Sequence, residues 1–168
     1  MRVSPNLSAM IGANAFVSDP RQPGKYESGG GGLLSTTGDY TRFLQMMING
    51  GSLDGKRYLS PKTVAYMTSD HMGEKVVPGP LYIPGDGYGF GLGFAVRKSN
   101  GVAAAPGTEG DYSWGGAAGT YFWVDPKERM FVVFMMQAPK QRGPYPRMLK
   151  NMIYAAFERT AKPAPLQD

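Results

Sequence analysis

Few side chains in this sequence are of a type that could carry out catalysis or bind a metal. The chain of 168 residues has no cysteine and one histidine, His71. Thiol nucleophiles, thiolate zinc sites, iron–sulfur clusters and paired-histidine metal sites are therefore excluded. A Ser-His-Asp triad would have to use His71, but this residue follows a predicted helix end, as an exposed or helix-capping histidine does. The carboxylates of Asp39, Glu109 and Asp111 show no pattern that would bring two of them together.

The segment Gly110–Thr120 is a stronger candidate for a site. It is rich in glycine and alanine, and it leads into a bulky apolar stretch that begins at Tyr121. Glycine weakens a strand, so its presence at the start of one is explained by the close approach of a ligand or of another backbone. Glycine also recurs at every second position from residue 85 to residue 93, but this run does not open a helix, and a dinucleotide site is not predicted.

The composition indicates one ordinary globular domain. A chain of 168 residues is too short for two full-sized domains. Hydrophobic residues make up 42% of the chain and charged residues 18%, which excludes a highly charged disordered tail. No apolar run approaches the roughly 18 residues of a membrane helix. The first residues contain no apolar signal-peptide core, which favours a cytoplasmic location over export.

The formal net charge is +5, and the basic residues are scattered except near the C-terminus. A basic segment can bind nucleic acid or an anionic lipid surface. Because no recognition motif accompanies this group, we interpret it as the solvated face of a helix and expect neither nucleic acid nor membrane as a partner. Its members are Lys140, Arg142, Arg147, Lys150, Arg159 and Lys162.

Helices are predicted in the first half of the chain. Residues 1–30 carry too many prolines and glycines for a long helix and are expected to be irregular. Thr36 and Asp39 are spaced as a helix-capping pair, and the helix that they begin ends at Asn49-Gly50-Gly51. A short second helix begins at Ser60-Pro61 and ends near Ser69. The apolar face of the first helix comprises Tyr40, Phe43, Leu44, Met47 and Ile48.

Strands and a final helix are predicted in the second half. Residues 88–97 alternate large and small side chains and are expected to form one strand whose glycine face lies against another backbone. Residues 121–124 and 130–136 are expected to form an antiparallel hairpin around a tight turn at Asp125–Glu128. The last helix begins near Tyr145-Pro146 and ends at Pro163. Its apolar face is predicted to comprise Leu149, Met152, Ile153, Ala156 and Phe157.

This order of elements predicts an α+β fold in a single domain, residues 1–168. Its parts are an irregular segment (1–30), a helical region (31–75), and antiparallel strands with a packed C-terminal helix (76–168). Tyr121, Phe122 and Trp123 lie in the clearest strand and are expected to pack in the core.

Several blocks of the sequence resemble the serine β-lactamase-related family. The clearest is Trp114-Gly115-Gly116 with the following residues 117–128, which is similar to the third motif region of the family. The resemblance runs from about residue 20 to residue 160, and it is closest to the class C β-lactamase-like group that includes the family VIII carboxylesterases. Further matching blocks, in the same order, are residues 28–36, Asp39-Tyr40 with Phe43, Asn49-Gly50-Gly51 and Leu59-Ser60-Pro61.

The resemblance implies the C-terminal part of a β-lactamase-like fold. It also implies a serine hydrolase, related to penicillin-binding proteins, that works through an acyl-serine without metal or cofactor. In this family a Ser-x-x-Lys motif supplies the nucleophile, and a Tyr-x-Asn or Tyr-x-Ser motif supplies a general base. By the match, Trp114, Gly115 and Gly116 bind substrate, and the backbone N–H of Ala117 is an oxyanion donor on the cleft side of the motif strand. One such donor lowers the barrier to acyl transfer by roughly 3–4 kcal/mol.

Two departures from the family pattern bear on activity. No Ser-x-x-Lys motif occurs in the chain, because Ser60-Pro61-Lys62 has the wrong spacing, and both Tyr-x-Ser matches, at residues 26–28 and 58–60, fall in other family blocks. The nucleophile is therefore expected outside this chain, and the isolated chain is expected to be inactive. Trp114 replaces the lysine or histidine that is common at its position. Because a cation there would hold a substrate carboxylate, we expect a carboxylesterase acting on neutral esters rather than a β-lactamase.

A different class of function also fits the missing nucleophile. The chain could be a non-catalytic binding or structural module, or a truncated domain that complements a separate N-terminal half. The family's sheet and C-terminal helix would then lack part of their covering, so we expect a homo-oligomer or a complex with an N-terminal half. The small-molecule partner of the complete enzyme would be an ester.

Overall fold

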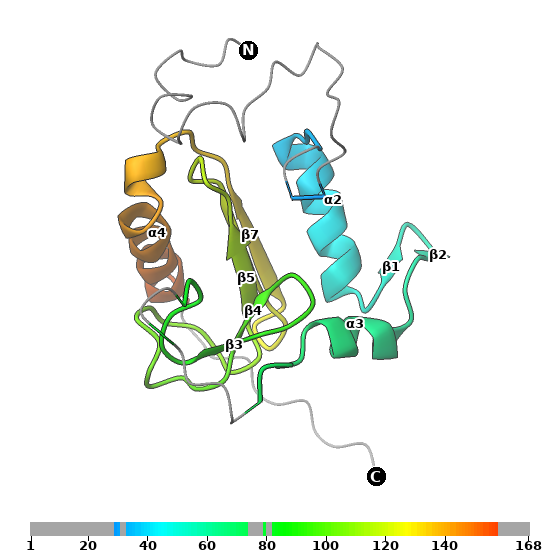
Figure 1. The fold of residues 1–168 in the computed structure, drawn as a ribbon. Helices are drawn as coiled ribbons and strands as arrows, with labels where there is room; N and C mark the ends of the chain where they lie inside the picture. The colour runs from blue at the N-terminus through cyan, green and yellow to red at the C-terminus, as the bar shows by residue number, and fades with distance from the viewer. Residues whose placement is uncertain (1–28, 31–32, 74–78, 80–81, 158–168) are drawn as a thin grey trace.

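The computed structural model of the chain describes residues 29–30, 33–73, 79 and 82–157. A five-stranded antiparallel sheet of order β3-β4-β5-β6-β7 lies between helix α4 on one face and helix α2 on the other (Figure 1). This architecture confirms the predicted α+β fold. The elements in chain order are α2 (Thr37–Ile48), β1 (Ser52–Leu53), β2 (Lys56–Arg57), α3 (Pro61–Met67), β3 (Tyr88–Phe90), β4 (Ala95–Arg97), β5 (Tyr112–Gly115), β6 (Tyr121–Asp125), β7 (Met130–Phe134), η1 (Pro139–Gln141) and α4 (Pro144–Ala155).

Both N-terminal helices begin at the predicted caps. The Oγ1 of Thr36 accepts a hydrogen bond from the backbone N–H of Asp39 at 3.1 Å and donates one to its carboxylate at 2.8 Å. Ser60 caps α3 by accepting a hydrogen bond from the backbone N–H of Thr63 at 3.0 Å. The predicted irregular segment lies outside the described residues, except for a turn at residues 29–30.

The prediction of one strand over residues 88–97 is wrong, because these residues form two strands. β3 and β4 pair as an antiparallel hairpin, and the backbone N–H of Gly91 closes the connection by donating to the carbonyl of Phe94 at 2.7 Å. The expected close backbone approach does occur, since a Cβ on Gly91 would collide with the carbonyl of Met67. Period-two alternation therefore identified the strands, but it did not reveal the reversal between them.

The predicted hairpin of the last two strands is confirmed. β6 and β7 pair from Tyr121 with Phe134 to Asp125 with Met130. β7 ends at Phe134, two residues before the predicted Met136. The turn between the strands is held by the carboxylate of Asp125, which accepts a hydrogen bond from the backbone N–H of Glu128 at 3.2 Å. Phe122 and Trp123 are buried in the core, as predicted, whereas Tyr121 is only half-buried.

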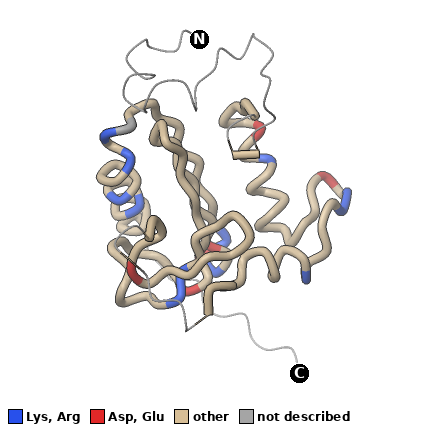
Figure 2. Tube along the Cα trace, viewed as in Figure 1, with Lys and Arg blue, Asp and Glu red and all other residues tan. Residues whose placement is uncertain are grey.

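The predicted packing face of the last helix is partly wrong. Leu149 and Ile153 are half-buried against the sheet, but Met152 and Phe157 are exposed, as is Ala156 just beyond the helix. Their places on the inner face are taken by Pro146 and Lys150. Lys150 was expected to be solvated and is 2% exposed, whereas Lys140, Arg142 and Arg147 are exposed as expected. Basic residues recur along α4 (Figure 2). Arg159 and Lys162 lie outside the described residues, and the predicted end of the helix at Pro163 is wrong, because α4 ends at Ala155.

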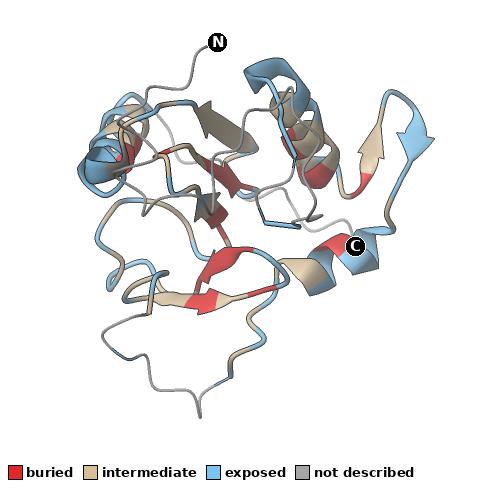
Figure 3. Ribbon diagram, turned by 45° about the horizontal axis from the view of Figure 1, so that its top comes forward, coloured by how far each residue is buried: buried red, intermediate tan, exposed pale blue. Residues whose placement is uncertain are grey.

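The two faces of the sheet differ in chemical character. The face toward α2 is apolar, and the buried residues concentrate in the central strands (Figure 3). The face toward α4 carries buried charged residues, among them Arg97 and Asp125. Among the described residues, no helix combines the length and apolar character needed to cross a bilayer. The apolar core on the α2 side consists of Leu44, Met47, Val64, Phe94, Val96, Tyr112, Phe122 and Val124.

Candidate active site

The hairpin of β5 and β6 carries the predicted motif residues at its closed end. Trp114 pairs with Phe122 and Gly115 with Tyr121. The ladder continues for one more residue, since the backbone N–H of Gly116 donates to the carbonyl of Thr120 at 2.8 Å. The N–H of Gly119 then donates to the carbonyl of Gly116 at 3.0 Å, and Gly119 has φ +104°. A three-residue loop that ends in a positive-φ glycine is a common hairpin connection built on a type I turn.

The segment that follows β7 is hydrogen-bonded to this turn. The backbone N–H of Ala138 donates to the carbonyl of Ala118 at 2.8 Å. A Cβ on Gly119 would lie 3.2 Å from the carbonyl of Ala138, and the positive φ of Gly119 disfavours any larger residue there. The turn at residues 117–119 is therefore fixed both by its own hydrogen bonds and by the segment that leads into η1 and α4.

Ala117 is the second residue of this turn and is exposed. β5 ends at Gly115, so Ala117 lies in the turn rather than on the strand, where the sequence placed it. The N–H at this position of a type I turn has no partner within the turn itself. Within the described part of the chain, the Ala117 N–H also has no hydrogen-bond acceptor. Its role as an oxyanion donor stays a prediction.

A pocket of about 330 Å³ opens beside the motif residues. It lies between the start of α2, the end of β5, the start of β6 and the end of β7. Of the four predicted site residues, Trp114, Gly115 and Gly116 line the pocket, whereas Ala117 lies beside it on the turn. None of the described lining residues is an Asp, Glu, Lys or Arg. The lining residues are Gly30, Leu33, Ser35, Tyr40, Trp114, Gly115, Gly116, Thr120, Tyr121, Phe122, Val133 and Met135.

The tyrosines of the pocket remain neutral at physiological pH. Burial raises the pKa of Tyr40, and burial is also the main reason why the pKa of Tyr121 is raised. By the resemblance described above, Trp114 replaces a lysine or histidine. Its ring contacts Phe90 edge-on, with ring centroids 5.1 Å apart. The pocket therefore offers apolar surface and hydroxyl groups, but no charge from its described lining.

The two motif glycines have close neighbours in their own hairpin. A Cβ on Gly115 would lie 3.1 Å from the ring of Tyr121, and a Cβ on Gly116 would collide with the hydroxyl of Thr120. These contacts explain the small residues by packing within the hairpin. The expectation that substrate lies along them stays a prediction.

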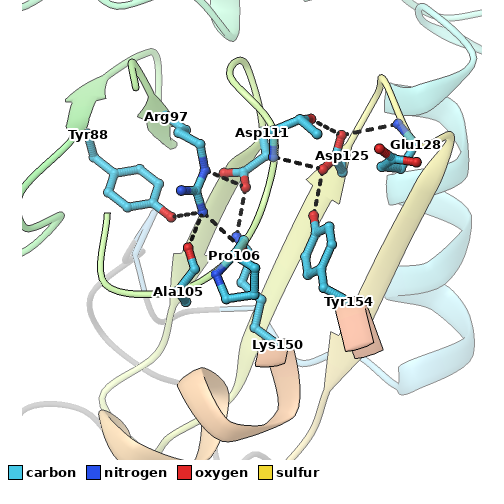
Figure 4. A network of polar contacts seen from close by, with 10 residues as sticks. Tyr88, Arg97, Ala105, Pro106, Asp111, Asp125, Glu128, Lys150 and Tyr154 are labelled. Atoms are coloured by element: carbon cyan, nitrogen blue, oxygen red, sulfur yellow. Dashed lines mark hydrogen bonds and ion pairs between the residues drawn. The ribbon is translucent and has the colours of Figure 1, made fainter. Parts of the chain in front are cut away.

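The opposite face of β5 holds a buried charge network (Figure 4). Asp111, just before β5, accepts hydrogen bonds on one carboxylate oxygen from Arg97 Nε and Lys150 Nζ, each at 2.8 Å. Nearby, Asp125 accepts hydrogen bonds from the hydroxyls of Thr108 and Tyr154. Burial lowers the pKa of Lys150, although the charge of Asp111 opposes this effect. None of the network residues Arg97, Asp111, Asp125, Lys150 and Tyr154 is among the described residues that line the pocket.

Sequence reasoning missed this network because it classed Lys150 as solvated and gave Asp111 no partner. A signal was present, since Lys150 lies four residues from Pro146 and three from Ile153, on the inward stripe of the helix. Of the other candidate residues, Glu109 is exposed, and Asp39 and His71 lie at helix ends. Asp39 belongs to the cap of α2. His71 is exposed, and its Nε2 lies 2.7 Å from the carbonyl of Tyr66 in the last turn of α3, as a capping histidine does.

Comparison with known proteins places the chain in a family. The profile of the Beta-lactamase family matches residues 5–156. Protein Rv1367c of Mycobacterium tuberculosis (strain ATCC 25618 / H37Rv) is 35% identical over 124 residues, which are 68% of this chain and 30% of that protein. The structure of EstCE1, described as a hydrolase with promiscuous acyltransferase activity, matches with a TM-score of 0.53 and 31% identity, over 66% of this chain and 28% of that one.

A second solved structure supports the fold alone. Simvastatin synthase (LovD) from Aspergillus terreus matches with a TM-score of 0.55 and 19% identity, over 73% of this chain and 34% of that one. The chain thus spans about a third or less of the length of these relatives. With the family profile covering residues 5–156 and the β-lactamase-like sheet in place, this chain belongs to the Beta-lactamase family of serine hydrolases.

Proposed function

We propose that this chain is the C-terminal portion of a serine carboxylesterase that acts on neutral esters. The observation that carries the proposal is the uncharged pocket beside Trp114, next to a turn whose Ala117 N–H lacks an acceptor among the described residues. In ester hydrolysis the serine oxygen attacks the carbonyl carbon, and the carbonyl oxygen gains negative charge. A fixed N–H donor beside the pocket stabilises that charge in the transition state.

The nucleophile in this proposal lies outside the chain, since no Ser-x-x-Lys motif occurs in it. After the attack, the alcohol leaves with a proton, and water then releases the acid from the acyl-serine. The residues of this chain take two parts in this sequence. Ala117 donates to the oxyanion, and Trp114 with the apolar lining holds a substrate that carries no carboxylate. The hydrolase and acyltransferase activity ascribed to EstCE1 supports acyl transfer as the reaction class.

The test removes the Ala117 N–H without disturbing the turn. Proline is favoured at the second position of a type I turn, so Ala117→Pro is compatible with the hairpin and lacks the donor. In the complete enzyme, with its nucleophile-bearing part present, kcat for a p-nitrophenyl ester should fall by roughly 10²–10³-fold. Ala117→Ser keeps the N–H and should retain activity. Equal activity of the two variants would show that Ala117 is not the oxyanion donor.

A second candidate is a non-catalytic module that pairs with itself or with a separate N-terminal half. It is favoured by the exposed apolar stripe on α4, where Tyr145, Met148 and Met152 are 43%, 52% and 63% exposed. Such residues are exposed together mainly where a partner covers them. The two candidates differ in one measurement. An inactive complex of the chain with the rest of the domain would support the module, and ester turnover by that complex would support the esterase.

A further inference from the structure

The buried charge network attaches α4 to the sheet at a cost in desolvation free energy. Arg97, Asp111 and Lys150 are 1%, 0% and 2% exposed. A buried set of charges is often no more stable than apolar residues of the same volume, whereas removal of one member leaves an uncompensated charge. Stability alone therefore does not explain why Lys150 stands on the inner face of α4. A preference for one relative position of the two elements does.

The contacts define that position closely. Lys150 and Tyr154 are one helical turn apart on α4, and they bond to carboxylates at the start of β5 and the end of β6. Sliding α4 along the sheet by one residue would break both contacts at once. Arg97, on β4, donates from Nε to the same oxygen of Asp111. Its Nη2 donates to the carbonyls of residues 105 and 106, each at 3.1 Å (Figure 4).

The segment before α4 reaches the other end of β5. The bond from Ala138 N–H to the Ala118 carbonyl ties the active-site turn to this segment, and six residues later α4 begins at Pro144. The helix is thus joined to β5 twice. One connection is the ion pair of Lys150 with Asp111 before the strand, and the other is the backbone bond at the turn after it.

From this double attachment we propose that Lys150 and Asp111 are positioning residues for the turn at residues 117–119, which carries the proposed oxyanion donor. Their ion pair fixes α4 relative to β5 and thereby sets where the Ala117 N–H stands beside the pocket. The inference rests on the proposed function for its catalytic meaning, because neither side chain contacts the pocket. Its structural part, the dependence of the turn on the ion pair, can be tested without any activity.

The first experiment uses the 168-residue chain labelled with ¹⁵N. Lys150→Met removes the charge while keeping similar bulk, and Ile153→Ala weakens packing of the same helix without touching the ion pair. We expect the amide resonances of Ala117 and Gly119 to shift in Lys150→Met, to stay in place in Ile153→Ala, and to return toward the native positions in Lys150→Arg. Unchanged resonances in Lys150→Met, or equal shifts in Ile153→Ala, would overturn the proposal.

If Lys150→Met does not fold, Lys150→Gln takes its place, because its neutral amide removes the ion pair while a polar group remains beside the buried carboxylate; the same comparison with Ile153→Ala then decides.

The second experiment measures kinetics in the complete enzyme. A small displacement of a catalytic group can cost up to about 10²-fold, so kcat should fall roughly 10- to 100-fold in Lys150→Met with KM little changed, and Lys150→Arg should restore it. Shifted resonances without ester turnover in the native complete protein would refute the proposed esterase and leave the positioning role standing. A native kcat in Lys150→Met would refute the positioning role.

Discussion

The hydroxyl of Tyr154 donates a hydrogen bond to Oδ2 of Asp125, across the interface between α4 and β6. Asp125 is completely buried, and the same carboxylate accepts hydrogen bonds from the backbone N–H groups of Thr108 and Glu128, each at 3.2 Å. One carboxylate therefore joins the C-terminal helix, the hairpin turn before β7 and the loop before β5.

Removal of this hydroxyl should destabilise the chain without unfolding it. Tyr154→Phe leaves Asp125 with its other donors, so we expect a loss of about 1.5–3 kcal/mol, as for a hydrogen bond to a charged group. Urea unfolding at fixed protein concentration measures the change. Tyr145→Phe, an exposed tyrosine on the same helix, is the control and should stay within about 0.5 kcal/mol of the native chain. Equal losses in the two variants would contradict the assignment.

Stability should fall steeply in alkali. Burial raises the pKa of Tyr88 and Tyr112, and burial together with Asp125 raises that of Tyr154. These phenols stay protonated in the folded chain but ionise near pH 10 when it unfolds, so their contribution is complete below about pH 10 and is lost as the pH rises further. Burial lowers the pKa of Lys150, so its contribution to stability rises with pH instead. Because one lysine opposes three tyrosines, the net stability still falls.

Urea unfolding between about pH 8 and about pH 11 tests this dependence, since it brackets the ionisation of an unfolded tyrosine. Tyr112→Phe should reduce the alkaline loss, because Tyr112 is 2% exposed. Tyr58→Phe removes a tyrosine that is 54% exposed, and its pH profile should match that of the native chain. A native profile in Tyr112→Phe would count against the burial argument.

The cap of α2 should be worth about 1 kcal/mol. Thr36→Ala removes the acceptor of the Asp39 N–H and leaves that donor at the helix start without its side-chain partner. Thermal unfolding should show the loss. Thr37→Ala, in the first turn and also exposed, should have little effect. Because α2 carries Tyr40 into the pocket, a change in Tyr40 fluorescence or NMR signals should accompany the loss of the cap.

The chain alone should not react as a serine hydrolase. Ser35 lines the pocket, but its hydroxyl is engaged with the carbonyl of Thr36 at 3.3 Å, and no Ser-x-x-Lys motif occurs in the sequence. A fluorophosphonate probe should leave the intact mass unchanged, and ester turnover should equal that of a heat-treated sample. Stoichiometric labelling of one serine would place the nucleophile inside the chain.

The isolated chain should associate rather than remain a monomer of 18.2 kDa. Among the described strands, β3 and β7 are the edges of the sheet, and exposed edges favour strand addition. The exposed stripe of Tyr145, Met148 and Met152 on α4 adds apolar surface. Static light scattering of a dilute sample measures the mass. A monodisperse species of monomer mass that unfolds cooperatively would contradict this prediction.

Local signals in the sequence predicted much of the fold. The cap at Thr36, the Ser60-Pro61 start and the apolar stretch from Tyr121 act within a few residues of themselves, and the structure bears out all three. The single strand over 88–97 failed because the turn at Gly91 depends on contact with Met67, which is distant in sequence.

The site was predictable only where one segment carries it. Trp114, Gly115 and Gly116 line the pocket as expected, but the walls from Tyr40 and Met135 depend on helix and strand packing that no local pattern encodes. The burial of Lys150 was not predictable for the same reason. Hydrophobic periodicity counts lysine as a surface residue, and only the partner Asp111, 39 positions away, compensates the charge of the buried ammonium group.

The alternation of charge across the sheet also bears on how the strands find their partners during folding. Arg97 and Asp111 meet as cross-strand neighbours, with the Arg97 N–H donating to the Asp111 carbonyl at 2.8 Å. A pairing error of one residue would turn a strand over, which would place a guanidinium or a carboxylate in the apolar layer beside Leu44 and Met47. Such a misaligned sheet would carry an unpaired charge in hydrocarbon surroundings. The buried charges thus disfavour out-of-register pairing of the strands during folding, and this effect does not depend on what the pocket binds.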